Sequence, residues 1–157
     1  MPRDIYKKQP VKQDDIYESL EVAKLINYVM IDGKKSVARK IVYQVFDRMK
    51  KEGKDPMVVL AEAIHNVAPI HEVKPRRLGG ASYLVPIEVR RERKLFLALN
   101  WIVDAAKAKS NKEFHTFAEK LYTEIMEAST NQGTAVGKKA QTEKLADANK
   151  AFSHLKW

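Results

Sequence analysis

The residues that most often carry catalysis are spread thinly along this chain. Its four histidines, His65, His71, His115 and His154, lie far apart in the sequence, and none belongs to an H-E-x-x-H metal motif. The chain has no cysteine, which excludes disulfides, Cys-ligated zinc, iron–sulfur clusters and thiol nucleophiles. We therefore expect no catalytic residue, no metal site and no cofactor.

Three other local patterns resemble catalytic motifs only in part. Asp14 and Asp15 are adjacent, so their side chains do not converge as an acid pair must. Ser82 lacks the glycine spacing of a nucleophile elbow. The segment from Gly133 to Lys139 resembles a phosphate loop, but its glycines stand one residue too close together and a lysine occupies the place of the Mg²⁺-binding Ser or Thr. We interpret these residues as parts of turns, of a hairpin and of helix ends.

The charge balance points to a binding function. The chain has 157 residues, of which 29 are Lys or Arg and 20 are Asp or Glu, for a net charge of +9. Such an excess usually indicates a polyanionic partner, because cations that neutralise phosphates release condensed counterions. Nucleic acid is favoured over a membrane surface, which would call for a basic helix with large apolar residues on its other face.

The sequence shows no sign of export or of a membrane span. Its apolar runs are far shorter than the roughly 20 residues that cross a bilayer. The first residues lack a basic segment followed by an apolar stretch. The expected location is cytoplasmic.

Apolar residues at helical spacing predict three helices within residues 19–69 and three within 91–149. Ser19 is the expected N-cap of the first helix, and Asp55 followed by Pro56 is typical of the start of the third. The second helix follows Lys34 and Lys35, and the fifth is expected from Phe114. The sixth, after residue 133, has the weakest apolar stripe.

Between residues 72 and 90 the helical period gives way to alternation of apolar and polar residues. Gly79 and Gly80 lie in the middle and suit a tight hairpin turn, which requires positive φ angles. Pro75 and Pro86 fit only edge positions, so the ribbon should have no further strand beside it. We predict a projecting two-stranded arm.

The predicted fold is therefore mainly α: a single-domain bundle of about six helices with a β-hairpin arm inserted between the third and fourth. Residues 1–18 are expected to form a basic N-terminal arm and residues 150–157 a C-terminal tail.

Basic residues gather at three places that suit phosphate contact. They are the turn before the second helix, the first strand of the arm and the base of the arm: Lys34, Lys35, Lys74, Arg76, Arg77, Arg90, Arg91, Arg93 and Lys94. The alternative is that these charges only solvate a turn and a strand edge. Tyr83 and Trp101 could stack on bases, although an aromatic residue within an apolar stripe, as Trp101 is, more often belongs to the core.

At this point the sequence resembles one family, bacterial-type small-subunit ribosomal protein seven. The resemblance covers essentially the whole chain. It rests on an ordered set of motifs: Asp32-Gly33-Lys34-Lys35-Ser36 with Ile41-Val42-Tyr43, Pro69 with Glu72-Val73-Lys74-Pro75-Arg76-Arg77-Leu78-Gly79-Gly80, Val85-Pro86-Ile87-Glu88-Val89-Arg90, and Ala148-Asn149-Lys150-Ala151-Phe152 with Trp157. The chain departs from the family pattern at Asn100, where Arg is usual, and at Gly137, where a basic residue is usual.

The resemblance implies a primary rRNA-binding protein that nucleates assembly of the small-subunit head, beside other head and platform proteins. It implies a place near the exit-site tRNA and the mRNA and, in some members, translational repression of the protein's own operon message. Carried over by position, the rRNA candidates are Arg3, Lys7, Lys8, Lys34, Lys35, Lys74, Arg76, Arg77, Arg90, Arg91 and Lys94. The tRNA and mRNA candidates are Gly79, Gly80, Tyr83, Lys138 and Lys139.

Two alternatives come from the residues alone. The first is a sequence-tolerant architectural DNA-binding protein that uses the same ribbon. The second is a basic enzyme that acts on an acidic substrate. Dependence of binding on the 2′-hydroxyl would separate RNA from DNA, and turnover of a substrate would mark an enzyme.

Overall fold

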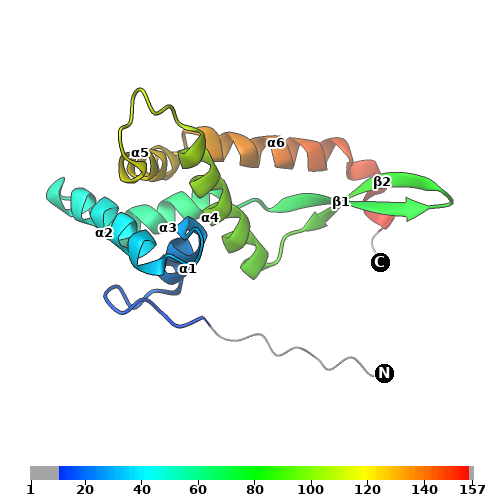
Figure 1. Ribbon diagram of the computed structural model, residues 1–157. Helices are drawn as coiled ribbons and strands as arrows, with labels where there is room; N and C mark the ends of the chain where they lie inside the picture. The colour runs from blue at the N-terminus through cyan, green and yellow to red at the C-terminus, as the bar shows by residue number, and fades with distance from the viewer. Residues whose placement is uncertain (1–10, 156–157) are drawn as a thin grey trace, which may run out of the picture.

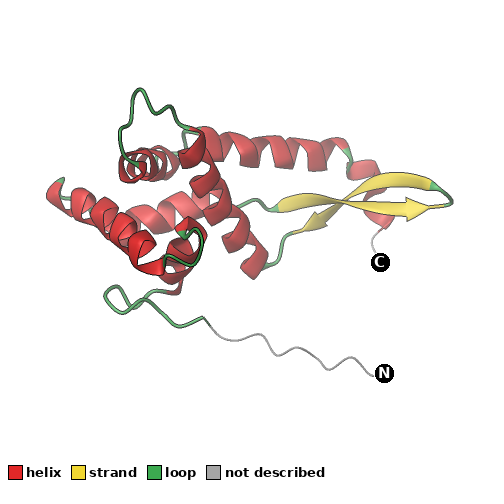
Figure 2. Cartoon of the chain, in the orientation of Figure 1, coloured by secondary structure: helices red, strands yellow, loops and turns green. Residues whose placement is uncertain are grey.

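The structure is a computed structural model that describes residues 11–155. Over these residues a helical body carries a two-stranded arm (Figures 1 and 2). The elements in chain order are α1 (Leu20–Val29), α2 (Lys35–Lys51), α3 (Pro56–Val67), β1 (His71–Leu78), β2 (Ala81–Glu88), α4 (Arg91–Ala108), α5 (Phe117–Ser129), α6 (Thr134–Ala148) and the 3₁₀ helix η1 (Lys150–Leu155). This confirms the mainly helical fold with a hairpin between the third and fourth helices.

Side-chain caps fix where several helices begin. The Ser19 hydroxyl accepts a hydrogen bond from the Val22 amide, and the Asp55 carboxylate accepts one from the Met57 amide at 2.9 Å. Both caps satisfy amides that have no partner within their own helix. The fifth helix begins three residues later than expected, because Thr116 and Glu119 form a reciprocal capping box at its start.

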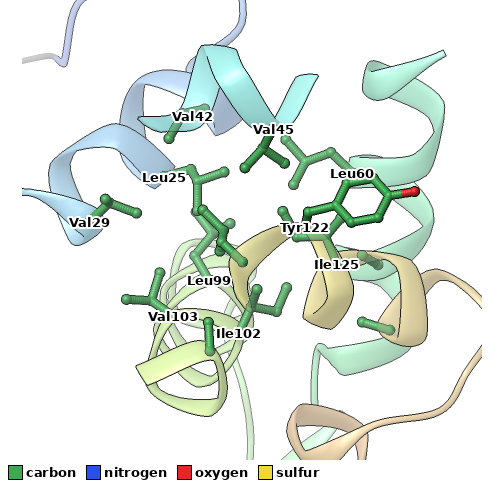
Figure 3. Close-up of a cluster of buried hydrophobic side chains, with 14 of the residues drawn as sticks. Leu25, Val29, Val42, Val45, Leu60, Leu99, Ile102, Val103, Tyr122 and Ile125 are labelled. Carbon is green, nitrogen blue, oxygen red and sulfur yellow. The ribbon is translucent and has the colours of Figure 1, made fainter. Parts of the chain in front are cut away.

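The hydrophobic core lies among α1 to α5. Side chains from all five helices meet there, including Leu25, Val42, Leu60, Leu99 and Ile125, each of which is almost or completely buried (Figure 3). Burying a side chain of this size contributes about 1.5–3 kcal/mol. Helix α6 adds little to this core, since only two of its residues are buried.

The arm is a two-stranded antiparallel ribbon. Gly79 and Gly80 turn the chain at its tip with φ values of 56° and 90°, a conformation that favours glycine. Pro75 and Pro86 lie on different strands, opposite Leu84 and Val73. Because each strand has a free edge, neither proline removes a bond from an inner ladder. Helix α6 runs alongside the arm, and η1 folds back towards it (Figure 1).

The segment before α1 packs on the body from Asp14 onward. The Asp14 carboxylate is buried and accepts hydrogen bonds from the Ile16 and Tyr17 amides and from the Tyr43 hydroxyl at 2.9 Å. Tyr17 in turn meets Phe46 edge to face, with ring centroids 4.9 Å apart. The expected basic N-terminal arm of residues 1–18 is therefore part of the body after residue 13, while residues 1–10 lie outside the described part of the chain.

Candidate nucleic-acid interface

The register of the arm divides its cations between two faces. Lys74 and Arg76 pair across the ribbon with Val85 and Tyr83, so these four side chains share one face. Arg77 is paired with Ser82 and lies on the opposite face. Lys74 and Arg77 are exposed, whereas Arg76 is half-buried. A nucleic acid could therefore meet cations on either side of the ribbon.

The C-terminal part of the chain holds the arm against the body. Glu143 accepts a hydrogen bond from the Ile70 amide at 2.9 Å, just before β1. Lys139 donates to the Asn66 carbonyl at 3.0 Å, at the end of α3. The ring of Phe152 in η1 lies 5.3 Å from the ring of Tyr83. We call Lys139, Glu143 and Phe152 the arm clasp.

The arm clasp changes the expectations for two segments. Residues 150–155 were expected in a tail, and they form η1, which packs against β2. The inner part of the arm is also less exposed than a free ribbon would be, because Val85 and Pro86 are buried. Sequence patterning missed these contacts because they depend on single residues, Glu143 of α6 and Phe152 of η1, rather than on an apolar stripe.

The base of the arm is a second cationic surface. Arg90 and Arg91 are exposed at the start of α4, and Lys94 is half-buried one turn later. No side chain caps this helix end, where unpaired amides and the helix dipole favour an anion. Arg93 serves a different purpose, because it pairs with Glu72 of β1 at 3.3 Å and lies over the ring of Phe96.

Lys34 lies at the end of the turn before α2, as the sequence predicted, whereas Lys35 already belongs to the helix. Lys34 is the N-cap residue of α2 and Lys35 is its first residue, and both are exposed. The preceding turn contains Asp32 and Gly33, both with positive φ. The turn therefore presents two cations beside a helix N-terminus that has no side-chain cap.

The residues expected on the tRNA and mRNA side differ in exposure and in their contacts. Gly79 and Gly80 are exposed at the tip of the arm. Tyr83 contacts Phe152 of the arm clasp, and Lys139 donates to the Asn66 carbonyl of the body. Lys138 is half-buried on α6. The tip is thus the accessible part of this set. The other candidates Arg3, Lys7 and Lys8 lie outside the described residues.

A buried carboxylate occupies the N-terminus of α6. Glu124 is inaccessible to solvent, accepts hydrogen bonds from the Ala135 amide at 2.9 Å and the Thr134 hydroxyl at 3.2 Å, and pairs with Lys109 at 3.0 Å. Lys109 also pairs with Glu127 at 2.8 Å. These contacts support the expectation that the phosphate-loop-like segment is a helix start, since Glu124 already accepts from the Ala135 amide and the Thr134 hydroxyl, which a phosphate would otherwise use.

Electrostatics explain why the Lys109 ammonium stays charged. Burial opposes its charge, but hydrogen bonds to Glu127 and Glu124 outweigh that effect and raise the pKa of Lys109. Sequence reasoning missed this group, although a signal was present. Glu124 lies three residues after Leu121 and four before Ala128, so a charged side chain falls on the apolar face of α5.

The two departures from the family pattern lie in ordinary surroundings. Asn100 is half-buried on α4. Gly137 is exposed on α6, and a Cβ atom built there would meet nothing within 4 Å. Packing therefore does not require glycine at this position.

Residues 11–155 form neither a metal-holding group of side chains nor a membrane-spanning helix. No group of three or more His, Asp or Glu side chains in that range is arranged to hold a metal ion. None of the helices in the same range is long and apolar enough to cross a membrane. Trp101 packs against the core cluster, and its ring is half-buried.

Comparisons with known proteins identify the family. A family model described as ribosomal protein S7p/S5e matches residues 1–150. Small ribosomal subunit protein uS7 of Caldicellulosiruptor bescii is 51% identical over 152 residues, which cover 96% of each chain. The proteins of the same name from Thermoanaerobacter pseudethanolicus and Thermotoga neapolitana are 50% and 49% identical over the whole of both chains.

These matches confirm the resemblance seen in the sequence, and they show that the basic-enzyme alternative is wrong. The chain belongs to the ribosomal protein S7p/S5e family, which is a family of structural ribosomal proteins and not of enzymes.

Proposed function

We propose that this chain is a structural constituent of the small ribosomal subunit and binds its rRNA through the arm, the arm base and the Lys34–Lys35 turn. Binding of rRNA is the general role of the family. The observation that carries the assignment to these residues is the arm itself: a ribbon with exposed cations on both faces, fixed to the helical body by the arm clasp. No other part of residues 11–155 combines an extended shape with this charge.

The mechanism follows from the geometry of RNA. An A-form helix exposes phosphates and 2′-hydroxyls, so a protein recognises it mainly by shape and backbone contacts. A narrow ribbon with Lys74 on one face and Arg77 on the other can lie along a groove and reach phosphates on both sides. Arg90 and Arg91 would then hold the backbone where the RNA meets the body. Arginine suits these contacts because its planar fork binds phosphate through two bonds.

The resemblance supports three finer assignments. The first is early binding that nucleates assembly of the subunit head, which fits a body whose hydrophobic core is closed by its own helices. The second is a place beside the exit-site tRNA and mRNA, for which the exposed Gly79–Gly80 tip is the best-placed contact. The third is self-repression, in which the operon message would copy the fold of the rRNA site and compete for the same cations.

Footprinting of small-subunit rRNA tests the proposal. Hydroxyl-radical cleavage should show backbone protection by the wild-type protein, and the double variant Lys74→Ala, Arg77→Ala should lose the part of the footprint that the arm makes. We expect binding to weaken by about 2–3 kcal/mol, since each charge-assisted contact contributes somewhat more than 1 kcal/mol. Lys107→Ala with Lys112→Ala is the matched control, because it removes two exposed lysines far from the arm, one in the last turn of α4 and one in the loop that follows it.

Two outcomes would contradict the proposal. The first is an unchanged footprint in the arm variant, which would make the arm charges purely solvating. The second is equally tight binding to a DNA duplex of the same length and charge, which would favour the architectural DNA-binding alternative. For the finer assignments, addition of the purified protein to rRNA before or after the other head proteins tests whether assembly depends on its early binding.

A further inference from the structure

An apolar groove lies beside the cationic base of the arm. It forms where α1, α3 and the first turns of α4 diverge, and has a volume of about 440 Å³. Its apolar lining includes Leu20 of α1, Leu60 and Ile64 of α3, and Leu95 of α4. Leu20 keeps 37% of its surface exposed, so the groove presents hydrophobic surface that the body itself leaves uncovered.

The rim of the groove is polar and carries more positive than negative charge. The rim has three cations, Lys24, Arg91 and Lys94, and two anions, Glu21 and Glu92. Two of these cations, Arg91 and Lys94, also border a neighbouring concavity formed with residues 88–90. The groove is therefore continuous with the arm base, which is one of the surfaces assigned above to the rRNA backbone.

This combination fits one chemical class of occupant. An unpaired nucleotide joins an anionic phosphate to a base whose flat faces are poorly hydrated, and proteins bind such bases by burying those faces beside planar or apolar side chains. His65 and Arg91 both line the groove and supply planar groups that can stack on a base. From the apolar floor, the cationic rim and its continuity with the arm base, we infer that the groove binds an unpaired base of the rRNA while the adjoining phosphate contacts Arg91 and Lys94.

This inference rests on the proposed function, and base-specific probing separates the two. The probe is small-subunit rRNA treated with dimethyl sulfate, which modifies unpaired adenine and cytosine, and with a carbodiimide, which modifies unpaired uracil and guanine, alongside hydroxyl-radical cleavage of the backbone. Wild-type protein should make one unpaired base unreactive, next to backbone that the arm base protects. Ala61→Leu should restore the reactivity of that base, because Ala61 is exposed in the groove and a leucine there would fill it.

The substitution at Ala61 has a matched control in Ala108→Leu. Ala108 is also an exposed helical alanine, at the far end of α4 and outside the groove. We expect Ala61→Leu to weaken rRNA binding about 5- to 150-fold, the range for one stacked base, with backbone protection retained at saturating protein. Ala108→Leu should leave affinity and base reactivity unchanged.

An abasic nucleotide at the protected position gives a second test that does not depend on how the variant folds. Wild-type protein should bind the abasic RNA about 5- to 150-fold more weakly than the intact RNA. The Ala61→Leu variant should bind the abasic RNA as tightly as wild type does. The inference is overturned if no unpaired base is protected, or if Ala61→Leu protects it as wild type does. It is also overturned if Ala61→Leu impairs only the joining of other small-subunit proteins, which would make the groove a peptide site. Missing backbone protection in wild type would instead contradict the proposed function.

Discussion

In the helical body, Leu25, Phe46 and Ile125 are completely removed from solvent, whereas the arm buries mainly Val85 and Pro86 and leaves its cations exposed. The body therefore draws its stability from apolar burial, which is roughly proportional to area. A two-stranded ribbon is marginal by itself in water and needs a surface to pack on. Helix α6 and η1 provide that surface, so the arm depends on the body for its position and the body depends little on the arm.

The largest effect should come from the core of the body. Phe46→Ala removes a fully buried aromatic ring and should lower the free energy of unfolding by about 3–5 kcal/mol. Urea unfolding followed by circular dichroism measures this loss. The folded fraction of the variant should still bind rRNA normally, since Phe46 touches no proposed contact. A loss of only a few tenths of a kcal/mol would mean that the body does not depend on this core.

The buried carboxylate at the start of α6 should come next. Glu124→Ala removes the partner of the Ala135 amide and one of the two partners of Lys109. Breaking a buried ion pair usually costs 3–5 kcal/mol, and we expect about 2–3 kcal/mol here because Lys109 keeps Glu127. Glu127→Ala is the control, because it removes the other, more exposed partner of Lys109. Equal, small losses in both variants would show that Glu124 does not anchor α6.

Alkaline pH should weaken the body through the half-buried Tyr43. Burial, together with the hydrogen bond to Asp14, raises the pKa of Tyr43 to about 12. Because the pKa of Tyr43 is higher in the folded protein than its unfolded value of 10, the protonated hydroxyl stabilises the folded state. This stabilisation is complete below pH 10 and is lost as the pH rises to about 12. Wild type should therefore lose about 1 kcal/mol more than Tyr43→Phe over this window. Parallel stability curves for the two proteins would contradict the assignment.

A smaller effect on stability is expected at the arm clasp. Phe152→Ala should cost the body about 1 kcal/mol or less, because the ring is only half-buried, but it should free the arm. The chain has no cysteine, so spin labels at Ser82→Cys and Gln44→Cys report the distance between arm and body without background. The distance distribution should broaden in Phe152→Ala and stay narrow in the control Ser153→Ala. A narrow distribution in both would show that other contacts hold the arm.

Local signals in the sequence predicted the elements well. The caps at Ser19 and Asp55 and the paired glycines of the arm tip each depend on a few neighbouring residues, and the structure confirms them. The start of α5 was readable too, since Thr116 followed three residues later by Glu119 is the pattern of a capping box.

Contacts between distant segments could not be read in the same way. Asp14 meets Tyr43 across 29 residues, and Glu143 meets the Ile70 amide across 73. Each contact joins single polar groups, which leave no periodic pattern in either segment. The cationic residues of the interface were predictable as clusters, and alternation along a strand places Arg76 and Arg77 on opposite faces. Which residues of β2 share each face followed only from the register.

The salt dependence of rRNA binding tests most directly whether the arm cations contact phosphates. The logarithm of affinity should fall linearly with the logarithm of salt concentration, with a slope set by the number of phosphates neutralised. Lys74→Ala with Arg77→Ala should reduce that slope by about 1.4–1.8, at 0.7–0.9 per contact, while the midpoint of thermal unfolding stays within about a degree or two. If the arm variant and the control variant Lys107→Ala with Lys112→Ala both keep the wild-type slope, the arm binds no phosphate.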